Sequence, residues 1–359
     1  MNFTSQLLDW YKNNKRVLPW KERNDPYAIW VSEIILQQTR VQQGAGYYAK
    51  FLEKFPTVFH LADAAEEEVL RIWQGLGYYT RARNMHKTAK TIVSHYKGVF
   101  PTTIEQLRQL SGIGPYTAAA IGSFAFGLPV VALEGNGYRI LARYYAVEEP
   151  LESARAKKIF TDLANQQLPK DNSAAFNQAL MDFGSLVCTP KPLCHSCPLS
   201  EACKAFREDK TDLLPARQIK TPPRNRYFNY LVYTLDNTTF IGQRKKDDIW
   251  KGLYEFPLIE TAEPVTFQQL CNTEMFKHML GTGTLSAFPE LIPDDTRTMP
   301  PHKLSHQTIY AVFYNIRLQN LLPFLQQKYV PVACKDLSQY AISRLTEKYL
   351  VFFHNFAGL

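Results

Sequence analysis

Four of the six cysteines in this sequence lie close together, and their spacing points to metal chemistry. They follow the pattern Cys188-x5-Cys194-x2-Cys197-x5-Cys203, whereas disulfide scaffolds spread their cysteines along the chain. Four thiolates in so short a segment can wrap one soft metal centre, either a [4Fe–4S] cluster or zinc. Zinc sites more often pair their ligands as two C-x2-C units, so the single unit here favours iron–sulfur. Such a site can also act as a structural clamp without redox chemistry.

A glycine-containing turn, Leu110–Thr117 (LSGIGPYT), is a second candidate site. Gly112 and Gly114 allow the backbone to approach a phosphate closely, and the N–H groups at the start of the next helix can then bind it. Between two predicted helices, this pattern indicates a helix–hairpin–helix clamp on the DNA backbone. A tight turn without a ligand is the alternative.

Length and charge agree with a nucleic-acid partner. The chain has 359 residues, enough for two or three domains, and 45% of them are apolar. Its 41 Lys and Arg against 33 Asp and Glu leave a formal net charge of +8, which suggests a polyanionic partner. No secretory signal precedes the first helix, and glycine and proline interrupt the uncharged run Gln109–Leu133. We therefore expect a soluble, cytoplasmic protein of the bacterial type, associated with the nucleoid.

The elements that must position these residues divide at a basic linker. Residues 1–207 predict helices joined by short loops, because apolar residues recur at spacings of three and four. The expected helices cover 27–43, Ala64–Gly75, Tyr79–Tyr96, Thr103–Leu110, Thr117–Phe126 and Ala154–Leu168. Prolines alternating with Lys and Arg over 208–226 indicate an extended linker.

Residues 227–359 predict a mixed domain of strands and helices. Tyr227–Leu235 and Thr239–Arg244 flank an Asp-Asn turn and are typical of a hairpin. Gln307–Arg317 alternates like a further strand, and Leu345–Phe356 predicts a final helix. The expected architecture is an all-α N-terminal half and a smaller α/β domain.

Longer motifs follow one another in an order that resembles the adenine DNA glycosylase (MutY) family of helix-hairpin-helix base-excision repair enzymes. They are Trp30–Thr39 (WVSEIILQQT), Gly75–Arg83 (GLGYYTRAR), the glycine hairpin and the four cysteines. The resemblance spans nearly the whole chain. It implies a multidomain protein: an all-α glycosylase with a six-helix core at about 22–128, a [4Fe–4S] cluster subdomain from about 1–21 and 129–207, and an α/β Nudix-like lesion-recognition domain at 227–359. The implied activity is removal of adenine opposite 8-oxoguanine or guanine.

The resemblance gives Glu33 the role of the general acid that protonates the departing adenine. Its neighbours Val31, Ile34 and Ile35 are apolar, so its carboxyl should be partly desolvated and its pKa raised. The family's adenine-pocket positions fall on Trp20, Lys21 and Gln178. Family members also insert side chains as wedges between stacked bases, and these positions fall on Gln37, Gln38 and Tyr78.

Two departures bear on the chemistry that the resemblance implies. Tyr116 stands where bifunctional relatives carry a Schiff-base lysine, which predicts a monofunctional glycosylase. Leu133–Arg139 (LEGNGYR) aligns with the family's D-G-N-V-x-R, so Glu134 replaces the aspartate that stabilises the sugar cation. Asn136 and Tyr116 are expected to assist it. The extra methylene moves the charge by roughly an ångström, which can cost on the order of 100-fold in rate.

In the C-terminal domain, Trp250–Pro257 (WKGLYEFP) matches the family's W-x-G-L-x-x-F-P stretch. His302–His306 (HKLSH) resembles its lesion-contacting F-S-H loop, which assigns this contact to Leu304, Ser305 and His306. The Ser305 hydroxyl can hydrogen-bond a base edge. No glutamate-rich Nudix helix follows Phe256, so nucleotide hydrolysis is not expected.

The predicted protein is thus a monomer that binds double-stranded DNA containing an 8-oxoguanine:adenine mispair and holds a [4Fe–4S] cluster. One alternative is a catalytically weak protein that binds the mispair, because Glu134 replaces the aspartate. Another is a glycosylase/lyase for oxidised pyrimidines, as in the endonuclease III family, which Tyr116 and the second domain weigh against.

Overall fold

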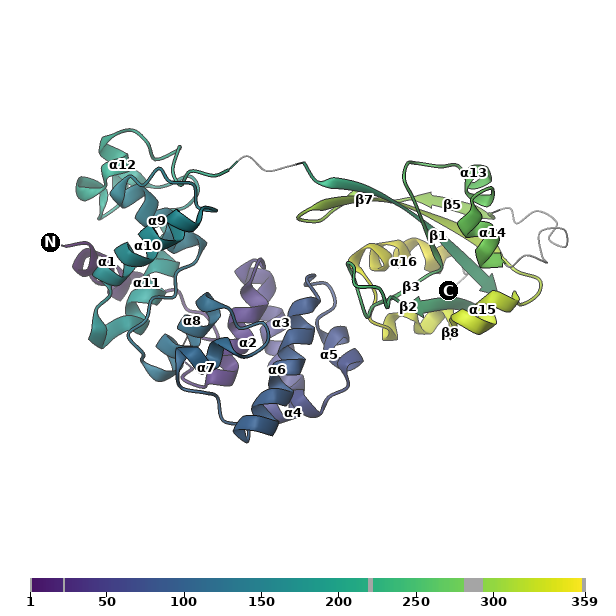
Figure 1. Cartoon of the computed structure of the whole chain (residues 1–359), viewed down its shortest axis with the longest axis horizontal. Coiled ribbons are helices and arrows are strands. Elements are labelled where there is room, and N and C mark those ends of the chain that lie inside the picture. The colour runs from purple at the N-terminus through teal and green to yellow at the C-terminus, as the bar shows by residue number, and fades with distance from the viewer. Residues whose placement is uncertain (1, 22, 219–221, 281–292, 357–359) are drawn as a thin grey trace. The chain divides into compact units, whose positions relative to one another are not determined.

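The computed structural model describes residues 2–21, 23–218, 222–280 and 293–356, which form two compact units (Figure 1). The first, here called the helical unit, comprises Met1–Ala64 and Arg83–Lys220. The second, the mixed unit, comprises Ala65–Ala82 and Thr221–Leu359. The two units divide after Lys220, inside the predicted linker, of which residues 219–221 lie outside the described part of the chain. None of the described helices combines the length and apolar character needed to cross a membrane.

The helical unit contains no strand among its described residues. Its helices are α1 (Phe3–Asn14), α2 (Pro26–Leu36), α3 (Val41–Lys54), α4 (Val58–Asp63), α7 (Ile104–Arg108), α8 (Pro115–Phe126), α9 (Gly135–Tyr145), α10 (Ala154–Gln167), η1 (Lys170–Asn172), α11 (Ser173–Leu186), η2 (Cys194–Ser196), η3 (Ser200–Ala202) and α12 (Lys204–Arg207). Helix α5 (Glu66–Ile72) belongs to the mixed unit, and α6 (Thr80–Tyr96) begins there and continues into the helical unit.

The predicted single helix over 27–43 is wrong, because two helices occupy this region. Asp25 caps the first, α2, by accepting hydrogen bonds from the N–H groups of Tyr27 and Ala28, and Pro26 occupies its first position. The chain then leaves the helical conformation, since Gln38 has a φ of 56°. A left-handed residue cannot continue a right-handed helix, so α3 starts afresh at Val41.

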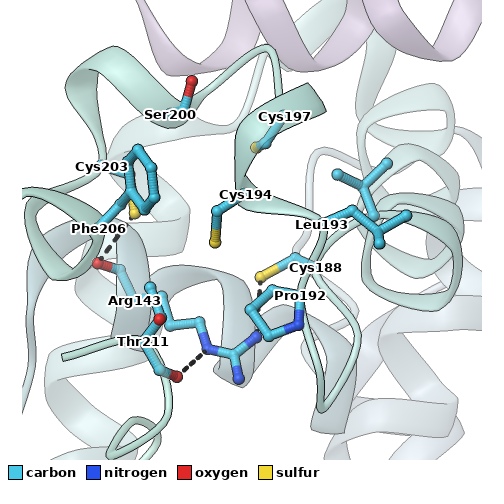
Figure 2. Close-up of a pocket in the computed structure, with 11 residues that line it drawn as sticks. Arg143, Cys188, Pro192, Leu193, Cys194, Cys197, Ser200, Cys203, Phe206 and Thr211 are labelled. Atoms are coloured by element: carbon cyan, nitrogen blue, oxygen red, sulfur yellow. Dashed lines mark hydrogen bonds between the residues drawn. The ribbon is translucent and has the colours of Figure 1, made fainter. Parts of the chain in front are cut away.

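The four clustered cysteines lie in a short segment after α11, here called the cysteine segment (188–203). It contains only two single 3-10 turns, η2 and η3. Figure 2 shows the sulfur atoms of Cys188, Cys194, Cys197 and Cys203 around a common space. The segment therefore lacks the regular hydrogen bonding that would hold it in place by itself.

Among the described residues, an eight-stranded sheet organises the mixed unit. Its strands are β1 (Arg224–Leu235), β2 (Thr238–Gln243), β3 (Tyr254–Glu255), β4 (Leu258–Thr261), β5 (Asp295–Thr298), β6 (His302–Lys303), β7 (Gln307–Arg317) and β8 (Val330–Ala333). The main path runs β3-β2-β1-β7-β5, with β4 beside β1, β6 beside β7 and β8 beside β2. The predicted hairpin is confirmed as β1 and β2, and the strand Gln307–Arg317 as β7.

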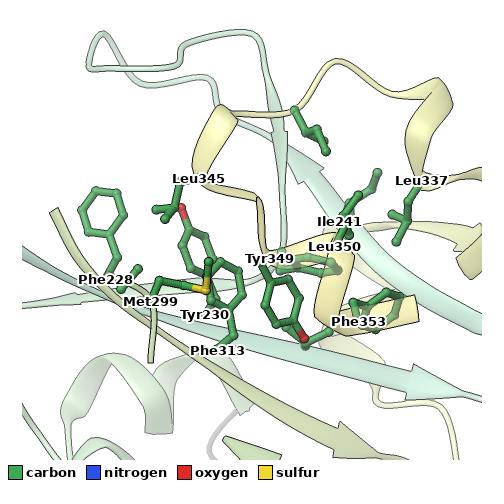
Figure 3. Close-up of a cluster of buried hydrophobic side chains, with 14 of the residues drawn as sticks. Phe228, Tyr230, Ile241, Met299, Phe313, Leu337, Leu345, Tyr349, Leu350 and Phe353 are labelled. Carbon is green, nitrogen blue, oxygen red and sulfur yellow. The ribbon is translucent and has the colours of Figure 1, made fainter. Parts of the chain in front are cut away.

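Helices cover both faces of this sheet, because alternate residues of a strand point to opposite sides. On one face, α16 (Arg344–Phe356) packs on Tyr230 of β1 and Phe313 of β7 (Figure 3). The rings of Phe313 and Tyr349 stack there with centroids 3.9 Å apart. The opposite face packs on short helices, which are α13 (Phe267–Cys271), α14 (Glu274–Leu280) and α15 (Pro323–Lys328). The 3-10 turn η4 (Cys334–Gln339) follows β8.

Candidate active site

Glu33 lies on α2, a helix that is buried from Tyr27 to Ile35. Only 8% of the Glu33 surface is exposed. Burial disfavours the charged carboxylate and raises the pKa of Glu33 to about 7. The partial desolvation expected from its apolar neighbours is therefore present, and this side chain can exchange a proton near neutral pH.

Tyr116, on the first turn of α8, holds the Glu33 carboxyl in place. Its hydroxyl donates a hydrogen bond to Oε2 of Glu33 over 2.8 Å. The bond stabilises the carboxylate and so lowers the pKa of Glu33, against the larger effect of burial. Burial and the neighbouring carboxylates raise the pKa of Tyr116 itself well above its usual value, so Tyr116 remains a neutral donor.

Glu134 brings a second carboxylate to this region. It is the N-cap of α9, and its Oε1 accepts a hydrogen bond from the N–H of Asn136 over 3.1 Å. The negative charge of Glu134 repels that of Glu33 and so raises the pKa of the Glu33 carboxyl. Asn136 is engaged differently, because its Oδ1 accepts a hydrogen bond from Arg139 over 2.6 Å. The structure thus unites Glu33, Tyr116 and Glu134 and leaves Asn136 as a neighbour of the cap.

Among the predicted adenine-pocket residues, Lys21 forms a buried ion pair. Its Nζ lies 2.5 Å from Oδ2 of Asp182, whose side chain is 1% exposed. The backbone N–H of Arg16 donates to the same oxygen over 3.0 Å. Burial lowers the pKa of Lys21, while the contact with Asp182 opposes that shift. Sequence reasoning missed Asp182, although an acid within the apolar helix α11 was a usable signal.

Gln178 lies one helical turn before Asp182, on the same side of α11. Its Oε1 is buried and has no hydrogen-bond partner among the described residues. A buried acceptor without a partner costs stability, so it marks a place where a ligand donor would be favoured. Trp20 is also buried and packs edge-on against Tyr48 with ring centroids 5.5 Å apart.

The predicted wedge residues Gln37 and Gln38 lie in the turn between α2 and α3. Gln37 reaches α8, where its Nε2 donates to Oγ1 of Thr117 over 3.3 Å. Gln38 is exposed and has the left-handed backbone described above. Gln38 therefore lies on the exposed side of this turn, and the hydrogen bond of Gln37 joins the turn to the start of α8.

The glycine hairpin has the backbone that its sequence predicts. Gly112 has a φ of 78°, and a Cβ atom there would lie 2.7 Å from Cβ of Asn84. Gly114 caps α8, and a Cβ atom there would meet nothing within 4 Å. Glycine is thus required at position 112 by the positive φ and by the close contact with Asn84. At position 114 it leaves open space at the start of α8.

Tyr78 and the predicted lesion-contacting loop come together within the mixed unit. The Tyr78 side chain is half exposed on a left-handed residue, and its hydroxyl lies 2.5 Å from Oγ of Ser305. Leu304 packs against the hydrophobic cluster below α16, and the backbone oxygen of His306 accepts a hydrogen bond from the N–H of Arg224. Sequence reasoning selected these residues separately and did not foresee the contact.

The cysteine segment offers a fitting donor set for a metal cluster. Arg143 of α9 reaches it, donating to Sγ of Cys188 over 3.5 Å and to the backbone oxygens of Thr189 and Pro190. Thiolates that share one zinc ion each lie ~2.3 Å from it and so crowd together. Within the described ranges, no three His, Cys, Asp or Glu side chains are arranged to hold a single ion. The four sulfur atoms face one common space, and thiolates are the ligands that both zinc and iron–sulfur centres use.

Comparison with known proteins decides the family. A model described as "HhH-GPD superfamily base excision DNA repair protein" matches residues 31–165, and a NUDIX domain model matches residues 229–351. The chain is 36% identical over 313 residues to the adenine DNA glycosylase of Buchnera aphidicola subsp. Baizongia pistaciae (strain Bp), covering 86% of this chain and 84% of that relative. The chain belongs to the adenine DNA glycosylase family.

Other comparisons agree with this family assignment. The chain is 32% identical to the adenine DNA glycosylase of Rattus norvegicus over 378 residues, covering 89% of this chain and 71% of that relative. A solved thermostable thymine-DNA glycosylase is similar at 27% identity and a TM-score of 0.53, over 57% of this chain and 95% of its own. The resemblance drawn from the motifs is confirmed, as are the helical glycosylase region and the Nudix-like C-terminal domain.

Proposed function

We propose that this protein removes adenine paired with 8-oxoguanine or guanine in double-stranded DNA, by hydrolysing the N-glycosidic bond. The observation that carries the proposal is the buried Glu33, hydrogen-bonded by Tyr116 and close enough to Glu134 to feel its charge. A carboxyl whose pKa is raised to about 7 can hold a proton at neutral pH and deliver it to a leaving base.

In the proposed reaction, the adenine nucleotide leaves the base stack and its base reaches Glu33 and Gln178 in the helical unit. Oε1 of Gln178, which lacks a partner, would accept a hydrogen bond from an amino group of the base. Glu33 protonates the adenine, the N-glycosidic bond breaks, and the Glu134 carboxylate stabilises the positive charge left on the sugar. Water then adds to the sugar carbon and gives its proton to the Glu33 carboxylate. Two carboxylates with different environments share acid and stabilising roles in this way.

Tyr116 supports a monofunctional glycosylase. A lyase would need an amine to form an imine with the sugar, and the phenol at this position supplies none. We expect no covalent product when borohydride is added to the reacting protein–DNA mixture. Trapping of the chain on DNA would instead favour the glycosylase/lyase alternative.

The lesion would be read by the mixed unit. Ser305 offers a hydroxyl, and Tyr78 beside it offers an exposed ring that can enter the base stack. Leu304 and His306 complete the loop. The start of α8 at Gly114 would bind backbone phosphate, and we propose that the protein acts on DNA as a monomer.

We also propose that Cys188, Cys194, Cys197 and Cys203 hold a [4Fe–4S] cluster. When bound, the cluster would fix the cysteine segment, which has little regular structure of its own. Purified protein should contain four iron and four sulfide per chain, and Cys197→Ser should lose both and become sensitive to proteases within residues 188–203. Stoichiometric zinc in freshly purified native protein would contradict this proposal.

The decisive test of the function is single-turnover excision from a duplex with one 8-oxoguanine:adenine pair at low salt. We expect the parent protein to release adenine, faster than from a guanine:adenine pair, and Glu134→Gln to be at least tenfold slower. Tight binding without release of adenine by the parent, with excision restored by Glu134→Asp, would favour the mispair-binding alternative.

Replacing Tyr116 by Phe should change the pH dependence of excision. The variant loses a donor that stabilises the Glu33 carboxylate, so the pKa of Glu33 rises further and the alkaline limb of the rate profile moves to higher pH. The maximal rate should fall by no more than about tenfold, the range of one hydrogen bond. Tyr96→Phe is the control, and an unmoved alkaline limb in Tyr116→Phe would contradict the assignment.

A further inference from the structure

The chain between α8 and α9 leads directly to Glu134 without regular structure. Residues 127–133, here called the entry segment, lie within the described part of the chain and form neither helix nor strand. Ala132 of this segment is only 2% exposed, so its N–H group is shielded from water. Buried backbone groups need hydrogen-bond partners. In a segment without helix or strand, side chains can supply them.

Asn177 of α11 supplies these partners, and its side chain is fully buried. Its Oδ1 accepts a hydrogen bond from the N–H of Ala132 over 3.0 Å, and its Nδ2 donates to the backbone oxygen of Val130 over 2.9 Å. Nδ2 also donates to Oγ of Ser123, on α8, over 2.9 Å. One amide group thus joins α8, α11 and the entry segment.

Helix α11 also contacts the chain just beyond Glu134. A Cβ atom on Gly184 would lie 2.5 Å from Cβ of Asn136 and 3.1 Å from its Cα. These atoms are the backbone and the first side-chain carbon of Asn136, so they move only with the start of α9. Glu134 therefore lies between two points at which the chain is held against α11, residue 132 before it and residue 136 after it.

The entry segment also bears on the groups around Glu33. Ala132 lies in a small hydrophobic cluster with two alanines of α8, and Tyr116 packs against this cluster. Tyr116 is the hydrogen-bond donor to Glu33, and Glu134 is the neighbouring carboxylate that raises its pKa. The path of the entry segment therefore influences both neighbours of the Glu33 carboxyl.

We propose that Asn177 is a positioning residue for Glu134. By holding residues 130 and 132, it fixes the direction in which the chain reaches the start of α9, and with it the place of the Glu134 carboxylate. Asn177 is fully buried, so it acts only through the backbone that it holds. The inference rests on the proposed function for its effect on rate, but its effect on the backbone can be measured without DNA.

Asn177→Leu keeps the approximate size of the side chain and removes its hydrogen bonds. It should slow single-turnover excision from the 8-oxoguanine:adenine duplex by at least about tenfold, and by no more than Glu134→Gln does, because small displacements of a stabilising group are costly in rate. Binding to the duplex should stay within about threefold, since Glu134 acts on a charge that develops only during the reaction.

A double variant separates positioning from a general loss of stability. If Asn177 acts through Glu134, then adding Asn177→Leu to Glu134→Gln should slow excision by no more than about threefold beyond Glu134→Gln alone, because residues that act through one another are not additive. A residue with only a structural role would instead multiply the two losses.

Amide hydrogen exchange of the free protein, measured by mass spectrometry, follows the backbone directly. Asn177→Leu should speed exchange at Ala132, which loses its acceptor, and at Asn136, whose N–H is bonded to Glu134. Ser173→Ala is the matched control, because Ser173 is also buried on α11 and its Oγ donates to the backbone oxygen of Leu128, farther from Glu134. The control should leave exchange at Asn136 and the rate of excision unchanged.

If Asn177→Leu fails to fold, as judged by circular dichroism, Asn177→Asp keeps the acceptor for Ala132, removes the donor to Val130 and takes its place. The inference is overturned if the folded variant excises adenine at the parental rate, if the two losses multiply in the double variant, or if Ser173→Ala is equally slow. A parent that releases no adenine refutes the proposed function alone. Unchanged exchange at Asn136 in the Asn177 variant refutes the positioning role alone.

Discussion

Glu33→Gln is expected to reduce adenine excision by about 10³-fold while leaving binding to the mispaired duplex within a factor of three, because general acids contribute about 10²–10⁴-fold. The amide keeps the size of the side chain and can still accept a hydrogen bond from Tyr116. It cannot deliver a proton to the leaving base. Single-turnover kinetics and a binding titration on the same duplex separate the two effects.

The same substitution should stabilise the protein above neutral pH. The pKa of Glu33 is raised from 4.5 to about 7 by burial, so the folded protein holds this proton more tightly than the unfolded chain does. Stability is therefore lost as pH rises through that window, by about 3 kcal/mol once the group is ionised, and Glu33→Gln avoids the loss.

Urea unfolding at pH 5 and pH 8 measures this difference. Glu53→Gln is the control, since Glu53 is an exposed carboxyl on α3. A parental rate of excision in Glu33→Gln would contradict its role as the acid. An equal change in stability at both pH values would show that its carboxyl is not desolvated.

Asp182→Ala is expected to destabilise the helical unit by about 3–5 kcal/mol, because it leaves the buried ammonium of Lys21 without its partner. The backbone N–H of Arg16 loses its acceptor as well. Without the carboxylate the pKa of Lys21 should fall further, so the loss of stability should be smaller at high pH, where the amine is neutral.

Chemical denaturation across pH tests this expectation. The double variant Lys21→Met, Asp182→Leu should recover most of the stability, because apolar residues of similar size can replace a buried ion pair. Glu148→Ala is the matched control, since it removes a carboxylate from an exposed pair with Lys210. Comparable losses in Asp182→Ala and Glu148→Ala would contradict the burial argument.

Most of the correct predictions came from patterns among residues that are close together in the sequence. The cysteine spacing and the apolar surroundings of Glu33 are visible in neighbouring residues, and so is the alternation in Gln307–Arg317. The break between α2 and α3 was missed because a left-handed Gln38 leaves no composition signal comparable to glycine or proline.

The contacts that sequence could not supply join residues far apart in the chain. The pair Lys21–Asp182 and the contact of Tyr78 with Ser305 depend on how the elements pack, and no periodicity encodes them.

The pairing of β1 with β7 has a consequence for how the protein folds. The two strands lie side by side in parallel, Arg224 opposite Gln307, although a long stretch of chain separates them. Closing such a loop costs conformational entropy before the two strands make any contact. This sheet should therefore form more slowly than the helices, whose contacts are local. Residues 65–82 belong to the same unit. They leave the ribosome early, but the Tyr79 hydroxyl can donate to the backbone oxygen of Ile342 only after residue 342 has been synthesised. A chain that stops before this residue would therefore leave part of its N-terminal half without its final contacts.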